Sequence, residues 1–266
     1  MIDHGHKSPA AVADIIAMAA VIWVAAATFH EGLGHGLACK AMGGEPIAWS
    51  TFRFECNHQA MSVWGRRIVA GAGTVVNLAL MGLSWLCWRL SIAATVKLAA
   101  WIAFVVNGLT SFGYLIFSAT FGIGDWNAAG VMAGVLDPWF ARGVLAVVGV
   151  AGYVAIIWAA ARMLSCILNG PSVAAHARRL AITIWVTTGG VSLLAGLSAD
   201  AAWQSTLGAS IGVALGGNAG LLSIARFMTP SPRQCSSDVP PSWILRGTAI
   251  VCVVAFVVVL GPGVRL

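Results

Sequence analysis

The sequence predicts an all-α polytopic membrane protein with about six to seven transmembrane helices and a short strand-like or re-entrant segment after the first. Two observations support this fold class. First, 59% of the 266 residues are hydrophobic and only 9% are charged, whereas soluble domains carry about 25% charged residues. Second, the chain divides into apolar runs of roughly 18 residues or more, the length that crosses a bilayer. We therefore expect one membrane domain over residues 1–266, in a cell membrane.

Seven apolar runs are expected to span the membrane. They cover residues 12–38, 68–90, 96–121, 142–168, 180–198, 206–225 and 244–261. Six spans remain an alternative, if one of the weaker runs is re-entrant. The sixth run, Gly208 to Ala225, is rich in glycine and is expected to be tightly packed or interrupted. Asn218 within this run is expected to hydrogen-bond to a neighbouring helix.

The longest polar stretch, residues 40–67, follows the first span. Gly43-Gly44 should end the first helix. The segment from Ile47 to Phe54 is rich in β-branched and aromatic residues, which predicts one or two short strands. At membrane depth such backbone needs a lining of protein or water.

The charges and cysteines exclude some classes of protein. The net charge of +6 is spread over the links between spans, as the positive-inside bias produces, so no nucleic-acid partner is expected. Nine Lys and Arg fall at the end where the chain starts and six at the end where the first span finishes, a slight bias that a six-span count would change. The six cysteines form no C-x-x-C pair, so we expect no disulfide framework. Cys87 and Cys252 are expected to be small core residues.

The first span ends in the stretch Phe29-His30-Glu31-Gly32-Leu33-Gly34-His35-Gly36. Ionisable side chains are costly inside a membrane span, so they indicate a functional site. Two imidazoles beside a carboxylate are the usual parts of a hydrolytic zinc site. The alternative is a pair of packing histidines without a metal, which would leave Glu31 near the bilayer without an evident partner.

The spacing of the two histidines restricts how they can meet. The common zinc helix has the form H-E-x-x-H, with the histidines four residues apart on one face. His30 and His35 are five apart, which separates them by about 140° on an ideal α-helix. A π-bulge would absorb the extra residue, and we favour this geometry. Alternatively, the helix breaks before His35, or Glu31 and His35 are the ligands and His30 lies behind them.

Two more polar residues follow within the next two spans. Asn77 lies inside the second span, after a run of small residues, and either bonds to another helix or contacts a substrate. Asp125 follows the third span in Phe121-Gly122-Ile123-Gly124-Asp125-Trp126-Asn127. Its glycines suggest an unwound helix end that presents Asp125 to a cavity; an interfacial aspartate beside a tryptophan is the alternative. His30 and Asn77 both lie about 12–14 Å from the same membrane side, where Asp125 also falls.

These three stretches resemble the motifs of the site-2 protease family of intramembrane zinc metalloproteases. The stretch from His30 to Ala38 resembles the family's H-E-L-G-H-x-x-A helix, with one extra residue. The stretch from Gly71 to Asn77 resembles its second motif, with Thr74 where proline is usual, and Gly124-Asp125-Trp126 resembles its third. The order of the motifs and the strand-like segment between the first two also match. The resemblance covers about residues 20–130.

The resemblance implies a zinc metalloprotease core over residues 12–127, with additional spans of unknown role over 142–261. It implies that His30, His35 and Asp125 bind Zn²⁺. It further implies that Glu31 is the general base and that Asn77 holds the substrate or its developing oxyanion. The extra residue in the histidine motif and the missing proline are departures from the family pattern.

The expected function is an intramembrane zinc endopeptidase that cuts a transmembrane protein or peptide within or near its membrane segment. Its other partner is the lipid bilayer. One alternative is an inactive relative that serves as a membrane scaffold. Another is an ion or proton transporter, for which the sequence offers few polar groups in the opposite half of the bundle.

Overall fold

The computed structural model describes residues 9–168, 172–199, 207–208, 211–228 and 240–266. Within these residues six helices are long and apolar enough to cross a membrane. The first comprises α1 (Pro9–Phe29), a π-helical segment η1 (His30–Gly36) and α2 (Leu37–Ala41). The next are α3 (Val63–Leu90), α4 (Ala94–Phe121), α5 (Pro138–Ser165) and α6 (Val173–Leu197). The last joins α8 (Trp243–Ala255) to η4 (Phe256–Leu260).

The sixth apolar run is interrupted, as its glycines predicted, and forms a shorter apolar segment rather than one of the six membrane-length helices. It consists of a π-helical turn η2 (Ile211–Gly217) and a 3₁₀ segment η3 (Ala219–Phe227), which meet at the fully buried Asn218. Asn218 donates from Nδ2 to the Thr110 hydroxyl at 3.2 Å, which confirms the expected bond between helices. The Gly220 N–H donates to the Tyr153 hydroxyl at 2.7 Å. These bonds seat the interrupted segment against α4 and α5.

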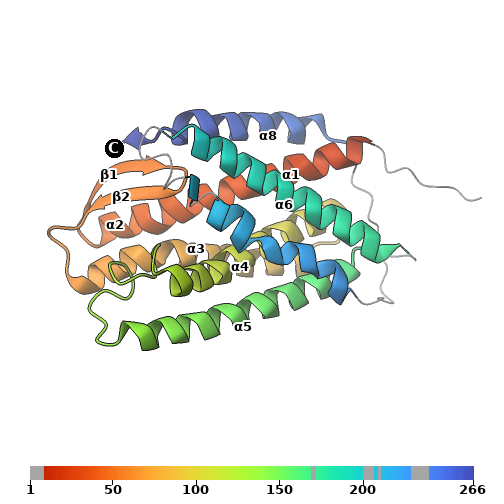
Figure 1. Cartoon of the computed structure of the whole chain (residues 1–266). Coiled ribbons are helices and arrows are strands. Elements are labelled where there is room, and N and C mark those ends of the chain that lie inside the picture. Colours follow the sequence, from red (N-terminus) through yellow and green to blue (C-terminus); the bar gives the residue numbers. More distant parts are fainter. Residues whose placement is uncertain (1–8, 169–171, 200–206, 209–210, 229–239) are drawn as a thin grey trace, which may run out of the picture.

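A small sheet covers one end of the bundle, which we call the sheet end (Figure 1). β1 (Glu45–Ser50) pairs antiparallel with β2 (Arg53–Asn57), which confirms the predicted strands. The C-terminal β3 (Val264–Arg265), which was not predicted, pairs with the other edge of β1. The end that holds the α3–α4 and α5–α6 links is called the opposite end.

Capping residues decide where several helices begin and end. Ser62 accepts the Gly65 N–H and Asp137 accepts the Phe140 N–H, both at 3.0 Å, as N-cap residues do. Because Ser62 caps α3, this helix begins at Val63 rather than at the predicted residue 68. Gly122 ends α4 with a φ of 68°, a conformation that favours glycine.

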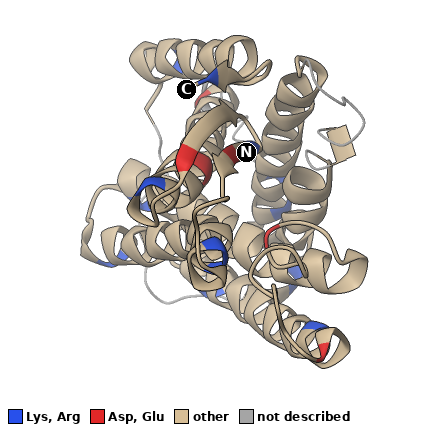
Figure 2. Cartoon of the chain, turned by 90° about the vertical axis from the view of Figure 1, so that its left-hand side faces the viewer, with Lys and Arg blue, Asp and Glu red and all other residues tan. Residues whose placement is uncertain are grey.

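The helices form a bundle with α4 near its centre. α4 packs against α1, α3, α5 and η2 and contributes a run of buried residues, whereas α3, α5 and α8 expose many apolar side chains. Apolar side chains pointing outward suit a lipid environment. Viewed from the sheet end, charged residues occupy few positions on the ribbon (Figure 2).

Tryptophan residues paired with cations mark both ends of the bundle. At the sheet end, Arg67 lies over Trp64 and Arg142 over Trp139. At the opposite end, such pairs among the described residues are Trp85 with Arg89, Trp88 with Lys97, Trp158 with Arg162 and Trp243 with Arg246. Amphipathic rings and cations at helix ends are typical of membrane–water interfaces.

The expectation about the cysteines was wrong in two respects. Cys39 of α2 and Cys56 of β2 form a disulfide, with Cα atoms 6.1 Å apart. Cys87 is exposed rather than buried in a core. The two bonded cysteines stand 17 positions apart, a spacing that matches no motif, and only the packing of the hairpin onto α2 brings them together.

Candidate metal centre

The π-helical segment η1 brings the two histidines together. Its hydrogen bonds join residues five apart, so His30 and His35 lie on the same face of the helix, one turn apart. Their Nε2 atoms are 3.3 Å apart and their ring centroids 5.0 Å apart. The favoured π-bulge is therefore confirmed, and the alternative of a helix break before His35 is wrong.

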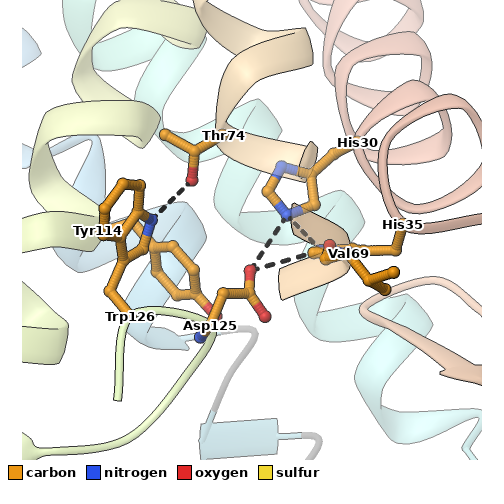
Figure 3. A network of polar contacts seen from close by, with 7 residues as sticks. All are labelled: His30, His35, Val69, Thr74, Tyr114, Asp125 and Trp126. Atoms are coloured by element: carbon orange, nitrogen blue, oxygen red, sulfur yellow. Dashed lines mark hydrogen bonds and ion pairs between the residues drawn. The ribbon is translucent and has the colours of Figure 1, made fainter. Parts of the chain in front are cut away.

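Asp125 approaches both histidines from the loop after α4 (Figure 3). Its Oδ2 lies 3.6 Å from His30 Nε2 and 3.3 Å from His35 Nε2. Gly124, with a φ of 82°, turns the chain toward the site, and the Asp125 N–H donates to the Tyr114 hydroxyl at 3.2 Å. The expected convergence of Asp125 with the histidine motif is present in the structure.

The acid–base state of Asp125 suits a ligand. Burial alone would raise the pKa of this carboxyl group. The close approach of the His30 and His35 rings, together with their charge, outweighs burial and lowers the pKa below its usual value. The group is thus a carboxylate, which is the form that coordinates metal ions.

Helix α3 orients the site from behind. His35 Nδ1 lies 2.7 Å from the Val69 carbonyl oxygen. Since a carbonyl only accepts, Nδ1 carries a proton, and Nε2 is the nitrogen that faces the site. Trp126, next to Asp125, donates its indole N–H to the Thr74 hydroxyl at 2.9 Å. Arg67 donates from Nε and a terminal nitrogen to the Ala133 carbonyl and so ties the same loop to α3.

The His30 ring is held mainly by packing. It lies over Gly73 of α3 so closely that a Cβ on Gly73 would overlap the imidazole. Its edge faces the Tyr114 ring at 6.3 Å between centroids. The buried Nδ1 has no hydrogen-bond partner among the described residues, so no hydrogen bond there selects its tautomer.

The three atoms His30 Nε2, His35 Nε2 and Asp125 Oδ2 form a triangle with edges of 3.3, 3.3 and 3.6 Å. In a tetrahedral zinc site with bonds of about 2.0–2.1 Å, neighbouring ligand atoms lie about 3.3–3.4 Å apart. The triangle thus has the size of one face of such a site. The donor set, two imidazoles and a carboxylate, is also one that zinc accepts.

Glu31 lies beside this triangle and is nearly fully buried. Ligand atoms of His30, Glu31 and His35 lie within 4.8 Å of one another, so this group could hold a metal ion. Glu31 also lines a cavity of about 470 Å³ together with His30, Asn77 and Tyr114. Its carboxyl is therefore available both to the metal centre and to a molecule in the cavity.

Asn77 lies in the wall of the same cavity rather than among the histidines. It is 2% exposed, and its Oδ1 has no hydrogen-bond partner among the described residues. The sequence left two roles open for Asn77, a bond to another helix or a contact with a substrate. The first role is not seen for this oxygen. An unpaired amide oxygen beside a cavity is suited to bind a ligand N–H.

The sequence did not point to Tyr114 or the Val69 carbonyl as supporting groups, and it gave Trp126 only as part of the third motif. Thr74 was noticed only as the residue standing where proline is usual, whereas the structure gives its hydroxyl a partner. The side chains of Tyr114, Trp126 and Thr74 gave only a weak sign of a supporting role, as hydroxyl or indole groups within or beside apolar runs. The Val69 carbonyl has no sequence signal because every residue carries one.

Comparisons with family models, with characterised proteins and with solved structures yield no match to this chain.

Proposed function

We propose that this protein is an intramembrane zinc metalloprotease that hydrolyses peptide bonds within or near transmembrane segments of other proteins. The observation that carries the proposal is the convergence of His30, His35 and Asp125 on one triangle of zinc-site size. This triangle lies near one end of a bundle whose six long helices have the length and apolarity of membrane spans.

The ligand set leaves room for catalysis. His30, His35 and Asp125 would hold the ion, and three protein ligands leave a fourth position open, as catalytic zinc sites require. A zinc ion bound there would lower the pKa of a water molecule to about 7 and polarise the substrate carbonyl. His35 is kept in the required tautomer by the Val69 carbonyl, as partners behind metal-binding histidines do.

Glu31 would act as the general base and then as the general acid. Its carboxylate lies next to the histidines and faces the cavity, so it can accept a proton from the attacking water. It can then deliver that proton to the amine that leaves when the peptide bond breaks. Asn77, in the cavity wall, would hold the substrate backbone through its unpaired amide oxygen.

The test is a measurement of metal content followed by a cleavage assay. Purified wild-type protein should bind about one zinc ion per chain, and His35→Ala and Asp125→Ala should lose it without unfolding. His58→Ala is the matched control, because His58 is an exposed histidine in the loop after β2. A wild-type protein that holds no metal after zinc is supplied would contradict the proposal.

Glu31→Gln separates an enzyme from an inactive relative. This variant should keep its zinc but cut a synthetic transmembrane peptide at least about 100-fold more slowly, the usual effect of losing a general base. If the wild type binds zinc yet cuts no transmembrane peptide in liposomes, the scaffold alternative takes precedence. Ion flux through liposomes that persists after chelation would favour a transporter.

A further inference from the structure

The cavity beside the metal centre has walls of mixed character. Its volume is about 470 Å³, within the range of roughly 300–1,000 Å³ that ligand pockets occupy. Most of the lining is apolar, and five aromatic rings contribute to it: Trp23, Phe52, Tyr114, Phe117 and Phe121. The polar residues His30, Glu31 and Asn77 also line it. The cavity therefore joins a large apolar space to the candidate reaction centre.

Besides His30, whose unpaired Nδ1 is described above, three lining residues carry buried polar atoms without a partner among the described residues. Trp23 Nε1, Thr51 Oγ1 and Asn77 Oδ1 make no hydrogen bond to any described residue. The three residues are only 1–2% exposed. Buried polar atoms in folded proteins are nearly always paired, so three such atoms around one cavity indicate a polar occupant.

The three atoms form a complementary set. An indole N–H only donates, an amide oxygen only accepts, and a hydroxyl does both. A peptide group presents one carbonyl acceptor and one N–H donor. A lipid acyl chain would fill the apolar space but leave all three atoms unpaired, so the set favours a peptide whose backbone is not paired within its own helix.

Trp23 is placed to act together with the reaction centre. It lies on α1 seven residues before His30, which is close to two helical turns, so both side chains share one face. Thr51 lies in the turn between β1 and β2 and closes the cavity from the sheet. Neither residue belongs to the proposed metal site.

We infer that this cavity is the specificity pocket for an unwound stretch of substrate, with a large apolar side chain held among the aromatic rings. The Trp23 indole N–H donates to a substrate carbonyl, the Asn77 amide oxygen accepts a substrate N–H, and the Thr51 hydroxyl bonds to the adjoining peptide group. This inference rests on the proposed function, because it assigns the pocket to the peptide that is cut.

Binding is measured separately from cleavage. In the Glu31→Gln background and in lipid nanodiscs, fluorescence anisotropy compares dye-labelled, capped pentapeptides of alanine whose central residue is alanine, leucine or phenylalanine. We expect the phenylalanine peptide to bind at least about tenfold more tightly than the alanine peptide, because a large apolar side chain is buried. Equal binding of the three peptides overturns the inference.

Two conservative substitutions test the hydrogen bonds. Trp23→Phe removes the indole N–H, and Thr51→Val replaces the hydroxyl by a methyl group. Each should weaken binding of the phenylalanine peptide about threefold to tenfold, while zinc content stays unchanged. Trp85→Phe is the control, because Trp85 lies on the exposed side of α3 outside the cavity. If Trp23→Phe fails to fold, the Thr51→Val result decides.

The possible outcomes separate this inference from the proposed function. If the peptides bind with the expected preference but wild-type protein cuts none of them or any transmembrane peptide, the protease proposal fails and the peptide pocket stands. If peptides are cut but neither binding nor cleavage depends on the central residue, Trp23 or Thr51, the pocket assignment alone fails. A third outcome is that lauric acid displaces the peptide while Trp23→Phe and Thr51→Val leave peptide binding unchanged. That result assigns the cavity to a lipid chain and overturns the inference.

Discussion

Gly34 of η1 packs directly against Gly73 of α3. A Cβ on Gly34 would lie 2.6 Å from the Gly73 Cα, a distance that real side chains do not adopt. The two backbones can approach this closely only because both residues lack side chains. This contact sets the His30 ring over Gly73 and places His35 beside the Val69 carbonyl.

Gly73→Ala is therefore expected to disrupt the metal centre. The new methyl group would overlap the His30 imidazole and force it away from the triangle. Zinc binding should fall at least about tenfold, the lower end of effects on groups that support metal ligands. Metal analysis and a zinc titration check this.

Gly82→Ala is the matched control for that substitution. Gly82 lies on the same helix, and a Cβ there would meet nothing within 4 Å. Alanine favours helix over glycine by about 1 kcal/mol, so this variant should bind zinc normally and be no less stable. Normal zinc affinity in Gly73→Ala would show that the close approach does not position His30.

Thr74→Val tests whether the Trp126–Thr74 hydrogen bond positions Asp125. The substitution keeps the shape of the side chain and removes the acceptor of the Trp126 indole N–H. The loop that carries Asp125 should then be held less firmly, and zinc affinity should fall about tenfold. Thr120→Val is the control, because the Thr120 hydroxyl bonds only within its own helix, to the Ile116 carbonyl. Equal zinc affinity in the two variants would rule out this role for Thr74.

Removal of the Cys39–Cys56 disulfide should loosen the sheet end. The bond closes a loop of 17 residues, for which loop-closure entropy predicts a loss of about 3 kcal/mol in the free energy of unfolding. Cys39→Ser combined with Cys56→Ser should lower the melting temperature, whereas Cys87→Ser, which removes an exposed free cysteine, should not. Thiol labelling of unfolded protein should gain two sites upon reduction; no gain would show that the disulfide is absent.

The disulfide also predicts the orientation of the protein in its membrane. Disulfides persist in oxidising compartments, which places the sheet end on the outer side of the membrane. The sheet end also carries fewer Lys and Arg than the opposite end, which favours the same orientation. In intact cells, an impermeant maleimide should label Gln59→Cys, in the exposed loop at the sheet end, but not Ile92→Cys, in the exposed loop at the opposite end. The reverse pattern would invert the orientation.

The buried Asp14 and the partly exposed Arg246 form an ion pair that should stabilise the fold without affecting the metal centre. Arg246 donates to both Asp14 oxygens at 2.9 Å, and the Ser242 N–H donates to Oδ1. Asp14→Asn should lower the melting temperature because it removes the negative charge from a buried ion pair. Zinc content should stay unchanged, since Asp14 precedes His30 by 16 residues, about 24 Å along the helix. Loss of zinc in this variant would indicate that the two regions are coupled.

Much of the local structure could be predicted because its signals are local. Apolar runs, turn residues and β-branched clusters act within a few neighbouring residues, so the spans and the β1–β2 hairpin followed from them. The five-residue spacing of His30 and His35 led to a π-bulge, because two costly imidazoles in one span gain most by sharing a face. Capping was harder to read, so α3 begins earlier than expected.

The sequence by itself predicted the polytopic helical fold with six to seven spans, the interruption of the sixth run and the residues His30, Glu31, His35 and Asp125 as candidates for one site. Only the tertiary structure decided how distant parts meet. The Gly34–Gly73 contact, the Trp126–Thr74 bond, the Cys39–Cys56 disulfide and the pairing of β3 with β1 each join residues far apart in the chain. Such pairings depend on the packing of whole helices, which no local pattern of residues encodes.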